Sequence, residues 1–332
     1  MSEIVAFFLA ASLIIYCCTG GADFGAGILE AFLPPSRKIQ HRKLVKKAIS
    51  PVWEANHVWL IIMIVILFVG YPAIYTQISL TFHIPLVLML VGIIVRGCAF
   101  VFRHYSPTDQ ADSKLYSWAF SLASILTPIF LGTVVGGLVA GFIPPTIGSF
   151  SETFIEPWFN PFAVSVGVFT ATIFAYLASA YLIDEAEDPE TAQCYRQLAV
   201  VTQWVMVGMG AVVVLTSTFT AFSLIQQFFA HKLSLACLAI ASALVAWGWR
   251  NFKTGNQRYL RYLASTQVTL VILAWLWIIM PTMLRYSDGS TFTLANHAGN
   301  SSITTLGICL LVGGSVIFPS LAYLLYIFKF QK

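Results

Sequence analysis

The sequence has too few charged residues to cover the surface of a soluble protein. Asp, Glu, Lys and Arg make up 10% of its 332 residues, whereas 58% are hydrophobic. A soluble domain is about one quarter charged, because its surface faces water. This shortage of charge excludes an ordinary water-soluble fold. It indicates that most of the protein surface faces lipid or other apolar partners.

The sequence also lacks the motifs of soluble catalysis and of structural metal sites. Its six cysteines are scattered, apart from the adjacent Cys17 and Cys18, and no CxxC or Cys/His zinc spacing occurs. No phosphate-binding loop, dinucleotide-binding glycine motif or nucleophile-with-base arrangement is present. We therefore expect no metal bound by this chain and no directly catalytic residue in it.

Long hydrophobic runs are what the sequence has in abundance. A helix needs about 20 apolar residues to cross the hydrocarbon core of a bilayer, and lipid leaves no partner for the backbone of irregular segments. We predict an all-α polytopic membrane protein with about nine transmembrane helices, forming a single transmembrane domain over residues 1–332. The predicted spans are 5–30, 52–74, 79–103, 115–142, 161–183, 197–228, 233–249, 260–284 and 303–328.

The positions of Lys and Arg set the orientation of these spans. With the N-terminus in the periplasm, nearly all of the 18 Lys and Arg residues fall on the cytoplasmic side, and only Lys232 and Arg285 fall outside. Cytoplasmic loops carry such an excess in membrane proteins. Nine spans then place the C-terminus in the cytoplasm.

Ionisable side chains inside spans are rare, and they usually face the protein interior or a water-filled path. In the first span, helical spacing puts Asp23, Gly27 and Glu30 on one face. Gly21 and Gly25 form a small-xxx-small pair that lets another helix approach closely. A buried Asp23 needs a partner or carries a proton, so both a structural hydrogen bond and a role in proton transfer stay open.

A second polar group opens the second span. Trp53, Asn56 and His57 share one face of the predicted helix, and Glu54 lies one turn in from its cytoplasmic end. The helix dipole alone could stabilise a Glu at this place, but it does not account for the Asn, the His and the two tryptophans, Trp53 and Trp59. Glu54 is within reach of water and beside a second titratable group. This position favours an entrance for protons.

The third span contributes two arginines that share a face, Arg96 and Arg103. We expect Arg103 to extend to the inner membrane surface, as long cationic side chains near span ends do. Arg96 lies deeper and needs an anion. Its candidate partners are Asp23, Glu54, a lipid phosphate and a cofactor carboxylate.

The stretch Trp53-Glu54-Ala55-Asn56-His57-Val58-Trp59-Leu60 resembles the signature of subunit II of cytochrome bd quinol oxidases, which typically reads W-(D/E)-x-N-x-V-W-L. The segment Asp23-Phe24-Gly25-Ala26-Gly27 is similar to the D-x-G-x-G pattern of that family's first helix. Arg96 and Arg103 resemble its third-helix arginine region. Length and topology agree over essentially the whole chain.

The resemblance implies a complex of the aerobic respiratory chain that oxidises membrane quinol and reduces O₂ to water in the bacterial cytoplasmic (inner) membrane. It implies two four-helix bundles plus a peripheral helix. Hemes of types b and d lie in a partner, subunit I, and none is ligated by this chain. The resemblance also implies support of subunit I, a proton path from the cytoplasm through Glu54, a bound quinone or lipid, and a small single-span accessory subunit. Nucleic acid is not an expected partner.

These patterns assign two sets of site residues. The proton path is predicted to use Glu54, Asp23, His57 and Asn56, and structural or ion-pair roles are predicted for Arg96, Arg103, Trp53, Trp59 and Glu30. Two other classes of protein compete with this interpretation. A secondary transporter with a proton-coupled site near the cytoplasmic face also buries a few charges, although such proteins usually show internal repeats and broken helices. A b-type cytochrome with its own heme needs paired histidines.

Overall fold

The computed structural model describes residues 1–49, 53–105, 112–220, 222–254 and 259–327. Within these residues, nine helices are long and apolar enough to cross a membrane, which confirms the predicted all-α, multi-pass fold. These helices are α1 (Ser2–Phe32), α3 (Trp53–Gly70), α5 (His83–Tyr105), α6 (Asp112–Ala140), α8 (Pro161–Glu185), α9 (Pro189–Ser217), α11 (Lys232–Thr254), α12 (Leu260–Ile279) and α13 (Asn300–Leu325). The shorter elements are α2 (Pro35–Ile49), α4 (Pro72–Thr81), α7 (Phe150–Phe154), α10 (Leu224–Ala230), β1 (Thr282–Arg285) and β2 (Thr291–Thr293).

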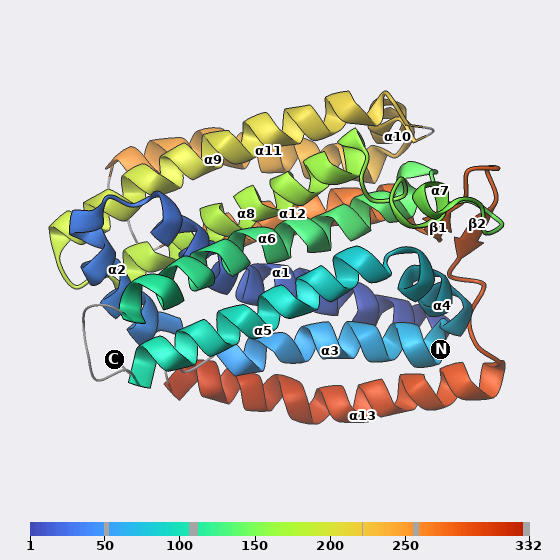
Figure 1. Cartoon of the computed structure of the whole chain (residues 1–332), viewed down its shortest axis with the longest axis horizontal. Coiled ribbons are helices and arrows are strands. Elements are labelled where there is room, and N and C mark those ends of the chain that lie inside the picture. Colours follow the sequence, from blue (N-terminus) through green and yellow to red (C-terminus); the bar gives the residue numbers. More distant parts are fainter. Residues whose placement is uncertain (50–52, 106–111, 221, 255–258, 328–332) are drawn as a thin grey trace.

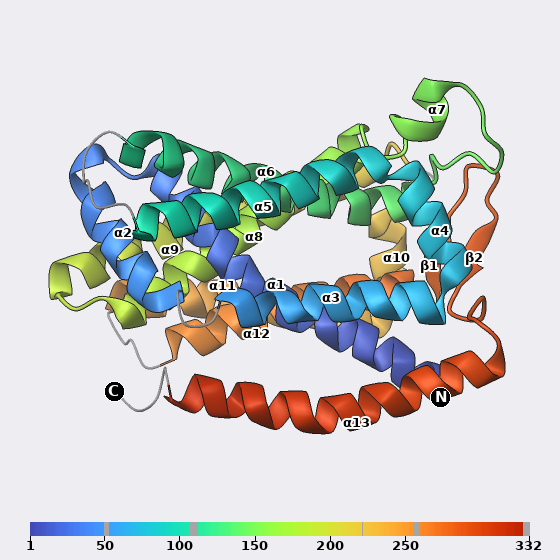
Figure 2. The ribbon, with the colours of Figure 1, turned by 60° about the horizontal axis from the view of Figure 1, so that its bottom comes forward.

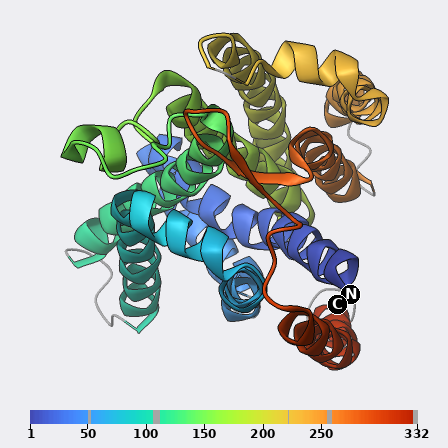
Figure 3. The ribbon, with the colours of Figure 1, turned by 90° about the vertical axis from the view of Figure 1, so that its right-hand side faces the viewer.

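Eight of the nine long helices named above form two groups of four, and α13 lies outside them (Figure 1). The first bundle contains α1, α3, α5 and α6, and the second contains α8, α9, α11 and α12. Helices α1 and α6 of the first bundle both pack along α8 of the second, so the two bundles share one continuous core. Helix α13 packs against α1 and α3 and lies at the margin of the assembly, as the view along the helices shows (Figure 3).

Two predicted spans, one in the first half of the chain and one in its middle, differ from the observed helices. The predicted span 52–74 is interrupted, because α3 ends at Gly70 and Pro72, which has no backbone N–H to continue a helix, begins α4. The predicted span 197–228 is displaced toward the N-terminus. Its helix α9 begins at Pro189 because the Asp188 carboxylate caps it, and it ends at Ser217.

The eighth predicted span, 260–284, is too long at its end. Helix α12 ends at Ile279, and β1 then pairs with β2 as an antiparallel hairpin outside the bundles. The hairpin register places Leu284 opposite Phe292, and Leu284 is fully buried. This small strand pair is an addition to the predicted all-helical architecture. The predicted limits at 52 and 328 lie outside the described residues.

The end of the bundles that carries α2 is called the inner end below. Helix α2 runs across the ends of the long helices there, whereas the start of α1 lies at the opposite end (Figures 1 and 2). Basic side chains of α2 are tied to the connection between α8 and α9 and to the start of α9. Lys47 pairs with Glu187, and Arg37 lies 3.8 Å from Glu190. The inner end is therefore the side on which the sequence places the cytoplasm.

Candidate functional site: a charged ladder in the first bundle

The inner half of α1 lies at the centre of the molecule because its glycines remove the side chains that would hold neighbours away. A Cβ on Gly25 would lie 1.9 Å from the backbone oxygen of Phe174 in α8, and a Cβ on Gly21 would meet the ring of the same residue. On another side of α1, a Cβ on Gly27 would lie 2.1 Å from the Ser124 hydroxyl oxygen of α6. This close approach is the one predicted from the small-residue pair, and it buries every residue from Gly20 to Glu30.

Asp23 faces α3 and α5 from this buried segment. The Asn56 side chain of α3 donates a hydrogen bond of 2.7 Å from Nδ2 to the Asp23 carboxylate. Arg96 of α5 is 3% exposed, and Asp23 is the acidic side chain that acts on its guanidinium electrostatically. Of the two acidic side chains named as candidates, Asp23 and Glu54, the structure therefore favours Asp23. The three side chains form one buried polar group drawn from three helices.

His57 and Trp53 surround this group with aromatic rings. The His57 ring lies 6.3 Å from the ring of Tyr16, 6.2 Å from that of Phe24 and 6.3 Å from that of Trp53. The guanidinium of Arg96 lies 4.4 Å from the centre of the Phe24 ring, a cation–π contact. The predicted site residues Asp23, Asn56, His57 and Arg96 thus come together in one place, enclosed by aromatic surface rather than by lipid.

Glu30 forms a second charged group two turns further along α1. It accepts hydrogen bonds from Arg42 of α2 (Nε to Oε1, 2.6 Å) and from Arg103 of α5 (Nη1 to Oε2, 2.9 Å). Only 12% of the Arg103 side chain is exposed. The expectation that Arg103 extends to the membrane surface is therefore wrong, because a buried carboxylate draws its guanidinium inward.

The two groups repeat at the same spacing on both helices. Asp23 and Glu30 are seven residues apart on α1, and Arg96 and Arg103 are seven residues apart on α5, which places each pair two helical turns from the next. Phe120 of α6 contacts both arginines, with its ring centre 5.5 Å from the Arg96 guanidinium and 4.6 Å from that of Arg103. We call Asp23, Arg96, Glu30 and Arg103 the charged ladder.

Glu54 lies outside the ladder. Its side chain is exposed, and it forms no hydrogen bond or ion pair with the described residues. It is two residues from Asn56 on the first turn of α3, so the two side chains leave different sides of the helix. This surface position agrees with the predicted access to water. The structure does not bring the Glu54 side chain into contact with Asp23.

Trp59 holds the peripheral helix in place. It is 5% exposed, and its ring lies 5.4 Å from that of Phe318 in α13. Trp53 in turn lies 5.8 Å from the Phe100 ring of α5. The predicted structural role of both tryptophans is consistent with these contacts.

Sequence reasoning missed His41, which ties α2 to both bundles. One nitrogen, Nε2, lies 2.9 Å from the backbone oxygen of Ala26 in α1, and Nδ1 lies 2.6 Å from the hydroxyl of Tyr195 in α9. Burial lowers the pKa of His41 to about 4 and outweighs the opposite effect of Glu30. His41 is therefore neutral at pH 7. A lone His in a basic loop carries no sequence signal for such a position.

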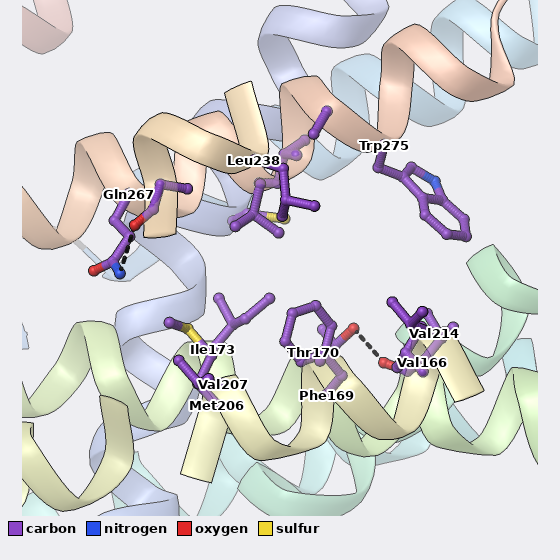
Figure 4. A pocket seen from close by; sticks show the side chains of 18 of the residues that line it. Val166, Phe169, Thr170, Ile173, Met206, Val207, Val214, Leu238, Gln267 and Trp275 are labelled. Atoms are coloured by element: carbon purple, nitrogen blue, oxygen red, sulfur yellow. Dashed lines mark hydrogen bonds between the residues drawn. The ribbon is translucent and has the colours of Figure 1, made fainter. Parts of the chain in front are cut away.

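The second bundle contains a cavity of about 360 Å³ near its centre. It lies between α8 and α9 on one side and α11 and α12 on the other (Figure 4). Its wall is mostly aliphatic and aromatic, with Phe169, Ile173, Met206 and Trp275 among the larger side chains. Gln267 stands at one end of it and belongs to a neutral hydrogen-bond network in which Tyr176 donates to its side-chain oxygen at 2.8 Å.

The residues that line this cavity fit an apolar ligand better than a heme. The cavity wall contains no histidine and no Lys or Arg, whereas heme iron is commonly bound by histidine and heme propionates need cations. Among the residues that the structure describes, no cluster of three or more His, Cys, Asp or Glu side chains is arranged to hold a metal ion. We therefore derive no step through a heme or metal bound by this chain.

Comparison with known proteins defines the class. The model of the family described as cytochrome bd terminal oxidase subunit II matches residues 1–328. The fold is similar to that of a chain in the bd oxidase structure from Geobacillus thermodenitrificans, with a TM-score of 0.79, 19% identity and coverage of 100% of this chain and 99% of that one. The structure therefore defines a multi-pass helical membrane protein with the bd-oxidase fold.

Two curated relatives agree with this class. The sequence is 27% identical to cytochrome bd-I ubiquinol oxidase subunit 2 of Escherichia coli (strain K12) over 175 residues, covering 51% of this chain and 45% of that protein. It is 28% identical to cytochrome bd ubiquinol oxidase subunit 2 of Bacillus subtilis (strain 168) over 172 residues, covering 51% and 49%. These matches span about half the length of each relative. Because the family model covers nearly the whole chain, the chain belongs to the cytochrome bd terminal oxidase subunit II family.

Proposed function

We propose that this chain is the subunit of a bacterial inner-membrane quinol oxidase that supports a heme-bearing subunit I and takes up protons for O₂ reduction. Membership of the family and the names of its relatives, which are quinol oxidase subunits, support the first part. The charged ladder supports the second. Buried ionisable groups in a membrane are expensive, and those that persist usually mark an ion or proton path.

The partner subunit is proposed to cover the outer faces of α3 and α5. These two helices expose a row of large apolar residues that includes Ile61, Phe68, Leu90 and Ile94. Glu54 is exposed as well. A partner that covers this surface encloses Glu54 at the boundary between the two subunits, with its inner side left open to the cytoplasm.

In the proposed path, Glu54 takes a proton from the cytoplasm, and the proton then reaches Asp23 by way of water beside Asn56 and His57. The Asn56 amide fixes the Asp23 carboxylate through a 2.7 Å hydrogen bond. Arg96 supplies a positive charge beside Asp23 between transfers. The one observation that carries this proposal is the buried Asp23–Asn56–Arg96 group, which begins two residues from an exposed acid on the same helix.

The cavity of the second bundle is proposed to hold the apolar tail of a quinone or lipid. Its volume of about 360 Å³ lies within the usual range for ligand sites, and its wall is almost wholly apolar. The side-chain amide of Gln267 at one end supplies a polar group for the ligand's head. Hexane extraction of the purified complex, followed by chromatography of the extract, tests for this ligand.

The composition of the complex is tested by purifying the tagged chain in a mild detergent and recording a reduced-minus-oxidised visible spectrum. Heme d absorption from a co-purifying subunit supports the proposed complex. A colourless chain that moves a solute in vesicles identifies a transporter instead. Heme in the isolated chain identifies a b-type cytochrome.

The proton role is tested by Glu54→Gln in the intact complex. We expect quinol oxidase activity to fall by about 10²-fold, the lower range for loss of an acid–base group, with heme content unchanged. Glu54→Asp keeps the carboxylate and should recover most of the activity. Glu190→Gln removes an exposed acid at the same end of the molecule and serves as the matched control. Full activity in Glu54→Gln would refute the role.

A further inference from the structure

A groove of about 480 Å³ lies at the inner end of the first bundle, outside the proposed proton path. Its walls come from the end of α1, from α2 and from the first half of α6. The polar wall contains Lys38 and Arg42 of α2 and Lys114, Ser117 and Ser121 of α6. The apolar wall contains Ile39, Trp118, Leu122 and Ile125. The groove is therefore polar on one side and apolar on the other.

The polar side of this groove has an excess of positive charge. Glu30 is its acidic wall residue, and Arg42 and Arg103 together already neutralise that carboxylate. Lys38 and Lys114 have no acidic partner among the residues that the structure describes. The described residues thus supply no counter-charge for Lys38 and Lys114 in this groove, and an anionic ligand would supply one.

The apolar side lies where a lipid chain would run. Trp118, Leu122 and Ile125 follow one another at helical spacing on α6, just after Lys114. Among the described residues, the part of α6 that is apolar enough to cross a membrane runs from Lys114 to Ala140, so these side chains lie in its first turns. Trp118 is 63% exposed, although a large aromatic side chain at this level is usually covered by lipid or protein.

We propose that this groove binds an anionic phospholipid of the inner leaflet. Lys38 and Lys114 hold the phosphate, the Ser121 hydroxyl hydrogen-bonds to the head group, and one acyl chain runs along Trp118, Leu122 and Ile125. A free phosphate ion would satisfy the cations but would leave the apolar wall uncovered. Basic pockets at the inner ends of transmembrane helices bind anionic head groups in this way.

The test is native mass spectrometry of the intact complex in nanodiscs made from phosphatidylglycerol and phosphatidylcholine. The wild-type complex should retain phosphatidylglycerol on release from the nanodisc. The double variant Lys38→Gln/Lys114→Gln should bind it about 30-fold more weakly, because each lysine near an anionic lipid contributes about a factor of five. The control Lys43→Gln/Lys46→Gln removes the same charge from exposed positions of α2 outside the groove and should retain the lipid.

Four results would overturn this assignment. One is equal retention of phosphatidylglycerol by the groove and control variants. Another is equal retention of phosphatidylcholine and phosphatidylglycerol by the wild type. The third is displacement of the lipid by millimolar inorganic phosphate, which would identify a simple phosphate site. Lys38→Arg/Lys114→Arg keeps the charge and should bind as the wild type does, so a loss of lipid in this variant would also contradict the proposal.

Discussion

The two bundles of this protein bury polar groups of different kinds in similar helical frameworks. The first bundle buries charges: Asp23, Arg96 and Glu30 are each no more than 3% exposed. The second buries a neutral network at its centre, in which Gln203 and Tyr176 reach Gln267 at 3.3 and 2.8 Å, beside an apolar cavity. A neutral network needs only hydrogen bonds. Buried charges need opposite charges at close range, which the first bundle obtains from three different helices.

Stability alone does not explain this difference between the bundles. Breaking a buried ion pair by removing one partner is strongly destabilising, because the other charge stays without compensation. A protein would lose little by replacing the charged ladder with apolar side chains if the ladder served stability alone. The charged ladder in one bundle and the neutral network at the centre of the other are the reason the proposed proton path is assigned to the first bundle.

The largest loss of stability should come from the close packing of α1 against α8, which joins the two bundles and is called the seam here. Gly25→Leu places a side chain where even a Cβ lies 1.9 Å from the Phe174 backbone oxygen, so α1 and α8 must separate. We expect a loss of more than about 4 kcal/mol in stability and no recoverable complex. Gly208→Leu, at a glycine with nothing within 4 Å of a Cβ, is the control. Purification yield measures both, and equal yields would show that the seam is not required.

The next largest loss of stability distinguishes the buried charged group of the first bundle from the buried neutral network of the second. Asp23→Ala leaves Arg96 without its acidic neighbour and should cost about 3–5 kcal/mol. Gln203→Leu in the second bundle should cost about 1–3 kcal/mol, the range for a lost buried hydrogen bond. The double variant Asp23→Ala/Arg96→Met should be more stable than Asp23→Ala. Thermal unfolding of the purified complexes measures all three, and similar losses in the two single variants would remove the distinction between the bundles.

A smaller effect, dependent on pH, should arise where α2 joins the two bundles. Burial lowers the pKa of His41 to about 4 in the folded protein, against 6.5 in the unfolded chain. The unfolded state therefore binds the proton more readily, and stability falls as the pH drops from about 6.5 toward 4. The loss should be on the order of 3 kcal/mol at the low end. His41→Gln should flatten this part of a plot of Tm against pH, and an unchanged slope would show that other groups cause the loss.

Sequence patterns predicted the fold and half of the ladder. Hydrophobic runs and the distribution of Lys and Arg predicted nine membrane helices, and the depth of Arg96 in its span made Asp23 one of its candidate partners. Patterns along single helices predicted no further contacts within the ladder. The pairing of Glu30 with Arg42 and Arg103 depends on how three helices cross, and no spacing along one helix encodes that.

The other missed features have a related cause. Phe120 between the two arginines and Tyr195 beside His41 are ordinary aromatic residues in their own helices, and only their neighbours in space give them a role. The cavity forms where side chains from several helices together do not fill the space between them, and no single helix shows this in its sequence. The exposure of Glu54 was foreseen from its place one turn inside the helix, because that signal is local.

The rate of proton uptake during a single turnover tests the central claim most directly. A flash releases O₂ to the fully reduced complex, and a pH-indicator dye follows the protons taken from solution. Asp23→Asn keeps the shape of the side chain and a hydrogen-bonding group for Asn56 but removes the titrating carboxylate, and Gln203→Leu changes the neutral network of the second bundle. The account predicts uptake slowed by at least about 10²-fold in Asp23→Asn and unchanged in Gln203→Leu, with hemes intact in both. Wild-type uptake in Asp23→Asn, or equal slowing in both variants, would contradict it.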